Sequence, residues 1–377
     1  MMMKSCILGA ALILAALPVS ARDLRYSHGF AASSAVGEAA EEFAAAVAEK
    51  SAGAVTFRIF PMSLMTLIET GPGVRDGLAD MGYVLAPYTP SDYPYYSFLH
   101  ELSMSINLRP ATGRESLAYA GAMMDYTFNN CPQCQADFAA QNQVYLSGAT
   151  SSVYALLCNK PVVTPEDLKG KRIRAGSPSF SRLSDHFGAN GIQMPANEVF
   201  EGLSQNVLDC AMLSAPELTT YSLKDVVTDI TLGLPGGIYA GAAVGNMNLD
   251  TWRGLSDADK AAVWWGANVL SADISWNYHA QDAENLTEAR GRGIQIHQAS
   301  DALIAEVRRY TAEDLERVVQ IFTDSYGLQD GAAHKEAFLA VLEKWYGLVE
   351  GVNSREDLRA LYWQEIYAKI DPATYAR

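Results

Sequence analysis

The stretch "EDLKGKRIRAGSP", Glu166–Pro178, decides the fold prediction, because a helical turn, a strand and a tight turn follow one another within it. Residues 171–176 have the composition of a β-strand, and the "GSP" that follows ends it. The chain carries a formal net charge of −15, yet four cations lie here within six residues: Lys169, Lys171, Arg172 and Arg174. A guanidinium at the end of such a strand is either a solvated surface charge or a binding group for an anion.

Strand and helix patterns alternate on both sides of this stretch. Before it, strand patterns at residues 23–28, 54–61 and 81–85 enclose an alanine-rich amphipathic helix at residues 35–53. After it, residues 197–209 read as a helix and residues 210–213, "CAML", as a strand. This alternation is typical of mostly parallel sheets covered by helices, so we expect an α/β fold.

The order of these patterns predicts two α/β units rather than one. No flexible linker separates them, and strand-like segments cross between them, which describes a hinged clamshell. We expect the first domain to comprise residues 22–150 with about 240–280, and the second residues 151–239 with about 281–377. The helical pattern of residues 257–293 is longer than a typical globular helix, so it either breaks or runs along both domains.

The N-terminus has the features of a cleaved secretory signal. Lys4 precedes an apolar run at residues 7–17, and small residues follow at positions 19–21. The run is too short to span a bilayer comfortably, and no later stretch is long and apolar enough. We therefore expect residues 1–21 to be removed near Ala21 and the product to be exported without being embedded in a membrane.

The cysteines that follow this segment number four, and an even count in an oxidising compartment favours disulfides. Cys131 and Cys134 fit a small loop, and Cys158 fits Cys210 if their strands are neighbours. A redox-active CxxC and a four-cysteine zinc site are the alternatives. The first lacks a thioredoxin-like context and the second lacks paired CxxC spacing, so we favour structural disulfides and expect no metal.

Charge and motifs narrow the function classes further. An acidic surface repels the phosphate backbone, which argues against nucleic acid as a partner. The sequence contains no HExxH, GxSxG, P-loop or GxGxxG motif. A Ser-His-Asp arrangement stays open, because its members need not be close in sequence, but no pattern supports one. We expect no cofactor and no enzymatic activity.

Arg174 is the strongest candidate for a binding residue. Of the two arginines it stands last on the predicted strand, and in open α/β sheets ligands bind outside the carboxyl ends of the strands. A guanidinium there can hold a carboxylate through two parallel hydrogen bonds. We expect Lys171 and Arg172 to be solvated edge charges, whereas position alone leaves both interpretations of Arg174 open.

At this point the chain resembles the substrate-binding proteins of TRAP transporters, the DctP-like family. Residues 161–176, "PVVTPEDLKGKRIRAG", and 198–211, "EVFEGLSQNVLDCA", are similar to its paired signature. Residues 26–61, 77–84 and 246–260 also resemble family segments, so the resemblance covers nearly all of the mature chain. It implies a periplasmic-binding-protein-like clamshell with crossing strands and a long C-terminal helix bracing both domains.

The resemblance also implies a function. Such a protein is a monomeric periplasmic receptor that binds a small organic anion, a carboxylate or a sulfonate, and delivers it to the membrane subunits of a TRAP transporter. Arg174 matches the arginine that clamps the ligand carboxylate, Ser177 a neighbouring position, and Leu213 with Ser214 a segment that offers polar groups. Tyr154 stands where many members carry a second arginine.

Cys210 departs from the family pattern by replacing its usual glycine, which supports pairing with Cys158. Further candidates for the ligand site follow from position alone, and structural roles are the alternative for each: Ser33, Ser34, Tyr88, Tyr239 and Asn246. For the two serines that alternative is a helix N-cap. An exported hydrolase or lyase of acidic substrates and a periplasmic sensor subunit remain the competing functions.

Overall fold

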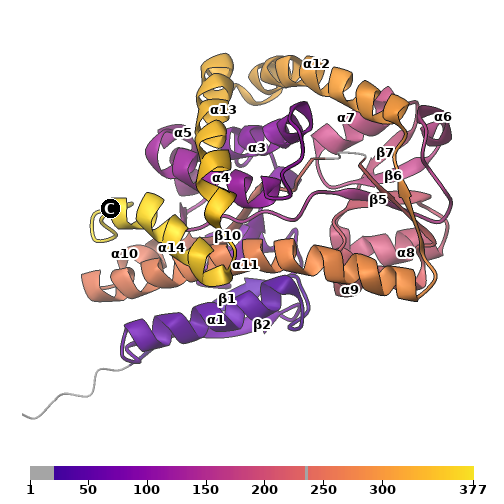
Figure 1. Cartoon of the computed structure of the whole chain (residues 1–377). Helices are drawn as coiled ribbons and strands as arrows, with labels where there is room; N and C mark the ends of the chain where they lie inside the picture. Colours follow the sequence, from indigo (N-terminus) through magenta and orange to yellow (C-terminus); the bar gives the residue numbers. More distant parts are fainter. Residues whose placement is uncertain (1–20, 234–236) are drawn as a thin grey trace, which may run out of the picture.

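The structure is a computed structural model and describes residues 21–233 and 237–377 (Figure 1). The predicted signal peptide falls on residues outside these ranges, apart from Ala21. Within the described ranges, no helix combines the length and apolar character that crossing a bilayer requires. The chain folds around two mixed β-sheets with helices packed against them.

The first sheet has five strands in the order β2-β1-β3-β10-β4. Strand β1 pairs in parallel with β2 and β3, whereas β10 is antiparallel to both β3 and β4. Residues of β3 and β10 are buried throughout, as expected for strands covered on both faces. The strand bounds are β1 Arg22–His28, β2 Val55–Pro61, β3 Met81–Leu85, β4 Gln143–Tyr145 and β10 Ala242–Asn248.

The second sheet has six strands in the order β11-β9-β5-β8-β6-β7. The strands predicted at residues 171–176 and 210–213 are confirmed as β6 and β8, which run in parallel. Their carboxyl ends therefore meet at the same edge of the sheet. The bounds are β5 Ala155–Cys158, β6 Arg172–Ala175, β7 Asn190–Gln193, β8 Cys210–Leu213, β9 Asp229–Leu232 and β11 Gln295–Gln298.

Two antiparallel segments cross from one sheet to the other. Residues 146–154 connect β4 to β5, and residues 237–241 lead into β10. They pair at the bridges Ala149–Ala242 and Val153–Ile238, and the amide of Ser151 donates to the carbonyl of Tyr239 at 3.0 Å. The crossing strands expected from the sequence are thus present as a two-stranded connection.

Helix α11, Asp257–Gly291, runs uninterrupted for 35 residues, about 50 Å at the rise of an α-helix. Ser256 and Asp259 begin it with a capping box. It packs against α1, Ala35–Lys50, beside the first sheet and reaches α9, Glu217–Thr220, beside the second (Figure 1). The two-domain clamshell with a bracing helix is confirmed.

The contact between α11 and α1 is close because α11 has a glycine there. A Cβ at Gly266 would lie 2.3 Å from Val47 and 3.0 Å from Phe43. Both side chains are fully buried in the core. We propose that each sheet is the centre of one domain, because the strands of each sheet lie within the residue ranges predicted for that domain.

The helices that follow α11 pack on both parts of the molecule. Helix α12, Asp301–Tyr326, contacts α7, Pro178–His186, and α14, Arg355–Glu365, contacts α11. Helix α13, Gly331–Leu348, packs along α4, Glu115–Asn129. The other α-helices are α2 Thr70–Arg75, α3 Pro94–Glu101, α5 Pro132–Ala140, α6 Pro165–Leu168, α8 Val199–Ser204 and α10 Leu249–Arg253.

Both predicted disulfides are formed. Cys131–Cys134 lies at the start of α5, and Cys158–Cys210 joins directly opposite residues of β5 and β8. In the described ranges, no cluster of histidine, cysteine, aspartate or glutamate is arranged to hold a metal ion. Both cysteine pairs are covalent cross-links. The Cys158–Cys210 disulfide fixes the register of two central strands of the second sheet.

Candidate functional site

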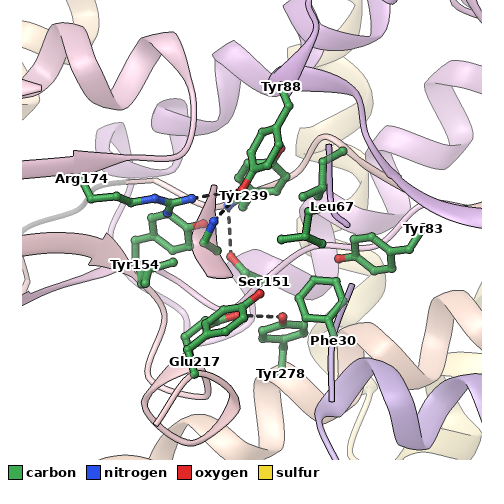
Figure 2. Close-up of a pocket in the computed structure, with 14 residues that line it drawn as sticks. Phe30, Leu67, Tyr83, Tyr88, Ser151, Tyr154, Arg174, Glu217, Tyr239 and Tyr278 are labelled. Carbon is green, nitrogen blue, oxygen red and sulfur yellow. Dashed lines mark hydrogen bonds between the residues drawn. The ribbon is translucent and has the colours of Figure 1, made fainter. Parts of the chain in front are cut away.

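A cavity lies where the two sheets face each other, beyond the carboxyl ends of β3, β6 and β8 (Figure 2). It encloses about 390 Å³ of space free of protein atoms, part of it open to solvent. This position is the usual ligand site of open α/β sheets. The cavity is lined by Phe30, Leu67, Tyr83, Leu85, Tyr88, Ser151, Tyr154, Arg174, Ala196, Leu213, Glu217, Tyr221, Tyr239 and Tyr278.

Arg174 reaches this cavity from β6 and is 1% exposed. Its Nε donates to the carbonyl of Met194 at 2.8 Å, and Nη1 donates to the carbonyl of Met212 at 3.2 Å. Nη2 donates to the hydroxyl of Tyr88 at 3.2 Å. All three acceptors are neutral, and among the described residues no carboxylate lies within ion-pair distance of the guanidinium. The cavity thus contains a buried cation without an anionic partner.

Arg172, two residues earlier on the same strand, has a different environment. Its guanidinium donates to the carboxylate of Asp209 through Nε at 3.0 Å and Nη2 at 2.8 Å. Its side chain is 41% exposed, and its hydrogen bonds lower the pKa of Asp209 to about 2. Arg172 is therefore partly exposed, in line with the surface charge expected from the sequence, but it is paired with Asp209, whereas Arg174 is enclosed.

Tyr88 connects the two walls of the cavity. It belongs to the short 3₁₀ turn Ala86–Tyr88, directly after β3 of the first sheet. Its hydroxyl accepts hydrogen bonds from Arg174 and, at 3.1 Å, from the backbone amide of Ala196, which follows β7 of the second sheet. One phenol therefore holds both sheets and orients the guanidinium.

Aromatic rings form most of the remaining wall (Figure 2). Phe30 packs edge-on against Tyr83 with ring centroids 4.8 Å apart, and Tyr88 against Tyr239 at 6.2 Å. Burial raises the pKa of Tyr83, Tyr221 and Tyr239, so their hydroxyls stay protonated and neutral. Within the described part of the chain, the buried hydroxyls of Tyr221 and Tyr239 have no hydrogen-bond partner. They are free to bond a ligand.

Glu217 is the second ionisable group with an unusual environment in the cavity. It begins α9, is 5% exposed, and accepts hydrogen bonds from the hydroxyl of Ser214 and, at 2.8 Å, from that of Tyr278 on α11. Burial raises the pKa of its carboxyl to about 7, although both hydrogen bonds act in the opposite direction. In the described ranges no cationic side chain forms an ion pair with it.

Half of the residues predicted for the site line this cavity: Arg174, Tyr154, Leu213, Tyr88 and Tyr239. Two others, Ser214 and Ser177, are not among the residues that line it. Ser214 donates to Glu217, and the hydroxyl of Ser177 shares a hydrogen bond of 2.9 Å with that of Ser179. The role of each in ligand binding stays a prediction.

The remaining three predicted residues lie elsewhere. The hydroxyl of Ser34 accepts from the amide of Gly37 at 3.1 Å and caps α1, which is the structural alternative considered for it. Ser33 and Ser34 line a separate hollow beside α9 and α11. Asn246 is fully buried in the first sheet and donates to the side chain of Gln143.

Sequence reasoning missed several residues that line the cavity. The position of Glu217 could have been used to predict it, because it follows the end of β8 closely and Arg174 lies near the end of β6. Tyr278 had no such signal, since it is one of many residues within a long helix. Phe30, Ser151 and Tyr221 lie in connecting segments whose direction is set only by tertiary packing.

The sequence profile of the bacterial extracellular solute-binding protein family 7, also called DctP, matches residues 26–320. The chain belongs to this family. The match includes both sheets apart from the first four residues of β1, the crossing connection and helix α11. The resemblance drawn from residues 161–176 and 198–211 is thereby confirmed.

Relatives of this DctP family protein are distant. A solute-binding protein of Albidiferax ferrireducens is 27% identical over 201 residues, 52% of this chain and 55% of the relative. The 2,3-diketo-L-gulonate-binding periplasmic protein YiaO of Escherichia coli is 30% identical over 167 residues, 41% of this chain and 48% of YiaO. The chain thus spans about half the length of the relatives it matches.

Solved structures share the fold over much more of the chain. A TRAP periplasmic solute-binding protein of Bordetella bronchiseptica, solved with bound mandelate, has a TM-score of 0.69 at 24% identity and covers 85% of this chain and 99% of its own. A TRAP solute-binding protein of Rhodoferax ferrireducens, solved with copurified benzoate, has a TM-score of 0.71 at 18% identity. The match covers 87% of this chain and 99% of that protein. A pyroglutamic acid receptor of Bordetella pertussis has a TM-score of 0.67 at 16% identity, covering 85% and 99%.

Proposed function

We propose that this protein is an extracytoplasmic solute receptor that binds a small carboxylate between its two domains and delivers it to the membrane subunits of a TRAP transporter. The observation that carries the proposal is the environment of Arg174, which is a buried guanidinium bonded only to neutral oxygens. We further propose that the protein acts in the periplasm as a monomer after loss of residues 1–21.

The chemistry of Arg174 favours an anionic ligand. Removing a cation from water costs several kcal/mol, and this cost is offset well only by an opposite charge with good hydrogen-bond geometry. The guanidinium has more N–H groups than its three neutral acceptors use. A carboxylate that docks beside it gains charge-assisted hydrogen bonds and completes the pairing.

The fold supports ligand-driven closure as the mechanism. The domains are joined by the antiparallel connection of residues 146–154 and 237–245 and by α11, which is an arrangement suited to hinge motion. Tyr88 and Arg174 approach the cavity from opposite sheets. A ligand that contacts both stabilises the closed form, because it binds that form better than the open one.

The neighbours reported above are consistent with an organic acid. They were solved with mandelate, benzoate and pyroglutamic acid, and each of these carries a carboxyl group. At such low identity, the similarity shows the fold of this chain but not its ligand. The choice among organic acids for this chain must therefore come from its own cavity.

A thermal-shift screen against small organic acids tests the proposal. A ligand that binds only the native state raises the melting temperature, and the rise grows with ligand concentration. We expect at least one carboxylate to do so with the wild-type protein and with Arg172→Ala, but not with Arg174→Ala. Stabilisation of Arg174→Ala equal to that of wild type contradicts the assignment.

The competing function, an exported hydrolase or lyase, makes a different prediction for the same ligand. A receptor returns its ligand unchanged after denaturation, whereas an enzyme converts it. Mass spectrometry of the compound released from the denatured complex separates the two. Recovery of a product in place of the added acid would favour the enzyme.

A further inference from the structure

The cavity contains a second buried ionisable group that the carboxylate anchor leaves unexplained. Glu217 enters from α9, whereas Arg174 enters from β6, and tyrosine rings surround both (Figure 2). The two side chains form no ion pair with each other, and in the described ranges neither has any other partner of opposite charge. The cavity therefore presents one cation and one carboxyl group at separate points of its wall.

We infer that the solute is a zwitterion, an amino-carboxylate whose carboxylate binds Arg174 and whose cationic nitrogen binds Glu217. The inference rests on the function proposed above and names the chemical class of the ligand. A zwitterion places a charge of the correct sign at each group. Such pairing offsets the desolvation of two protein charges at once, which no simple monocarboxylate can do.

The local hydrogen bonds of Glu217 fit this role. Oε1 accepts from Tyr278 and Oε2 from Ser214, so the carboxyl group is held from two sides in a fixed orientation. Each carboxylate oxygen can accept more than one hydrogen bond. An ammonium group supplies N–H donors for the remaining acceptor positions of Glu217. A second carboxylate on the ligand would instead place its negative charge beside that of Glu217.

The aromatic wall adds to the attraction of a cation. Phe30, Tyr83, Tyr221 and Tyr278 line the same cavity as Glu217. Faces of aromatic rings attract cations, and more strongly when the cation is removed from water. Rings combined with a carboxylate are a common arrangement for binding ammonium groups, including methylated ones.

Ligand affinity should depend on pH through the ionisation of Glu217. Six residues bond to this carboxyl or act on it electrostatically: Ser214, Tyr278, Tyr83, Tyr221, Tyr154 and Arg174. The pKa of every tyrosine in this set is raised, so only Glu217 changes charge near neutral pH. Because a cation binds the ionised carboxylate better, affinity for a zwitterion should rise between pH 5 and pH 8 and then level off.

Matched pairs of compounds test the inference. Each pair shares one carbon skeleton and differs only in an amine replaced by a hydroxyl or by hydrogen, such as phenylglycine with mandelate and phenylacetate. The panel also includes the common amino acids and betaines with counterparts that keep the carboxylate but lack the cationic nitrogen. We expect the zwitterionic member to raise the melting temperature of the wild-type protein more than its partners do, with at least tenfold tighter binding by calorimetry at pH 8.

Substitutions at Glu217 test whether this residue causes the preference for a zwitterion. Glu217→Gln should remove the preference for the zwitterion and the rise of affinity with pH, while Glu217→Asp should keep both with weaker binding. Glu201→Gln is the matched control, because Glu201 is exposed on α8 and its carboxylate accepts a hydrogen bond from the side chain of Gln205, away from the cavity. It should behave as wild type. A native melting curve for each unliganded variant shows that it is folded.

The outcomes separate this inference from the proposed function. If an acid without a cationic nitrogen binds as tightly as its amino counterpart, or if no zwitterion binds, the inference is overturned. The receptor function then stands as long as that acid depends on Arg174. If the zwitterion binds equally well to Glu217→Gln, Glu217 is not the cation site and the inference also fails.

Discussion

The hydroxyl of Tyr88 accepts a hydrogen bond from Nη2 of Arg174 at 3.2 Å, although the two residues belong to different sheets. The same hydroxyl accepts from the amide of Ala196 at 3.1 Å. These two bonds close one side of the cavity and fix the direction of the guanidinium. The direction of the Arg174 guanidinium is thus coupled, through a single phenol, to the contact between the two sheets.

Replacing Tyr88 by Phe should weaken ligand binding. The change leaves the amide of Ala196 and Nη2 of Arg174 without their acceptor, and a lost hydrogen bond of this kind costs about 1 kcal/mol. We expect a dissociation constant raised by roughly five- to tenfold in calorimetry. Tyr95→Phe is the control, because Tyr95 bonds the amide of Gln329 outside the cavity. Equal effects of the two variants would contradict a specific role for Tyr88.

Gly176→Ala should also weaken binding, for a steric reason. A Cβ at this position would lie 3.1 Å from both Nη1 and Nη2 of Arg174, which is tighter than ordinary contact. The guanidinium must then shift, and its alignment with a carboxylate suffers. We expect a clear loss of affinity with a melting temperature close to that of wild type. Unchanged affinity would show that the guanidinium tolerates displacement or lies away from the ligand.

The stability of the unliganded protein should depend on Glu217 between about pH 4.5 and pH 7. The pKa of this carboxyl is raised from 4.5 to about 7 in the folded state. Its contribution is therefore fully present below the unfolded pKa and is lost as the pH rises through the folded pKa, by at most about 3 kcal/mol. Denaturant unfolding at pH 5 and pH 8 should show a smaller loss in Glu217→Gln than in wild type. Identical losses would contradict the raised pKa.

The two disulfides should contribute unequally to stability. Cys158–Cys210 spans a sequence separation of 52 residues, whereas Cys131–Cys134 spans 3. Chain-entropy arguments give about 4 kcal/mol for the longer loop and about 2 kcal/mol for the shorter. Replacing each pair by alanines and measuring the free energy of unfolding tests this order. A larger loss from Cys131 and Cys134 would show that local strain or packing dominates.

The fold could be predicted from sequence because its signals are local and repeated. The strand that carries Arg174, the covering helix at residues 35–50 and the strand that ends near Leu213 each have clear hydrophobic periodicity and end signals. Helix α11 was ambiguous, since its pattern alone could not show whether it broke. In the structure α11 is continuous over 35 residues and packs against both α1 and α9.

The candidate site was predictable only in part. Arg174 follows from its place at a strand end, and Tyr88 from its place after another. Tyr278 comes from the middle of a helix and Phe30 from a loop, and only tertiary packing directs them to the same cavity. The place of Glu217 after β8 was visible in the sequence, but its burial and its contact with Tyr278 depend on how α9 packs against α11.

Calorimetric titration of Arg174→Ala beside Arg172→Ala tests the central claim most directly, with an acid found in the screen as ligand. The two arginines share one strand, but only Arg174 lines the cavity, while Arg172 is paired with Asp209. The account predicts that Arg174→Ala loses measurable binding while remaining folded, and that Arg172→Ala binds within a fewfold of wild type. Retention of wild-type affinity by Arg174→Ala would contradict it.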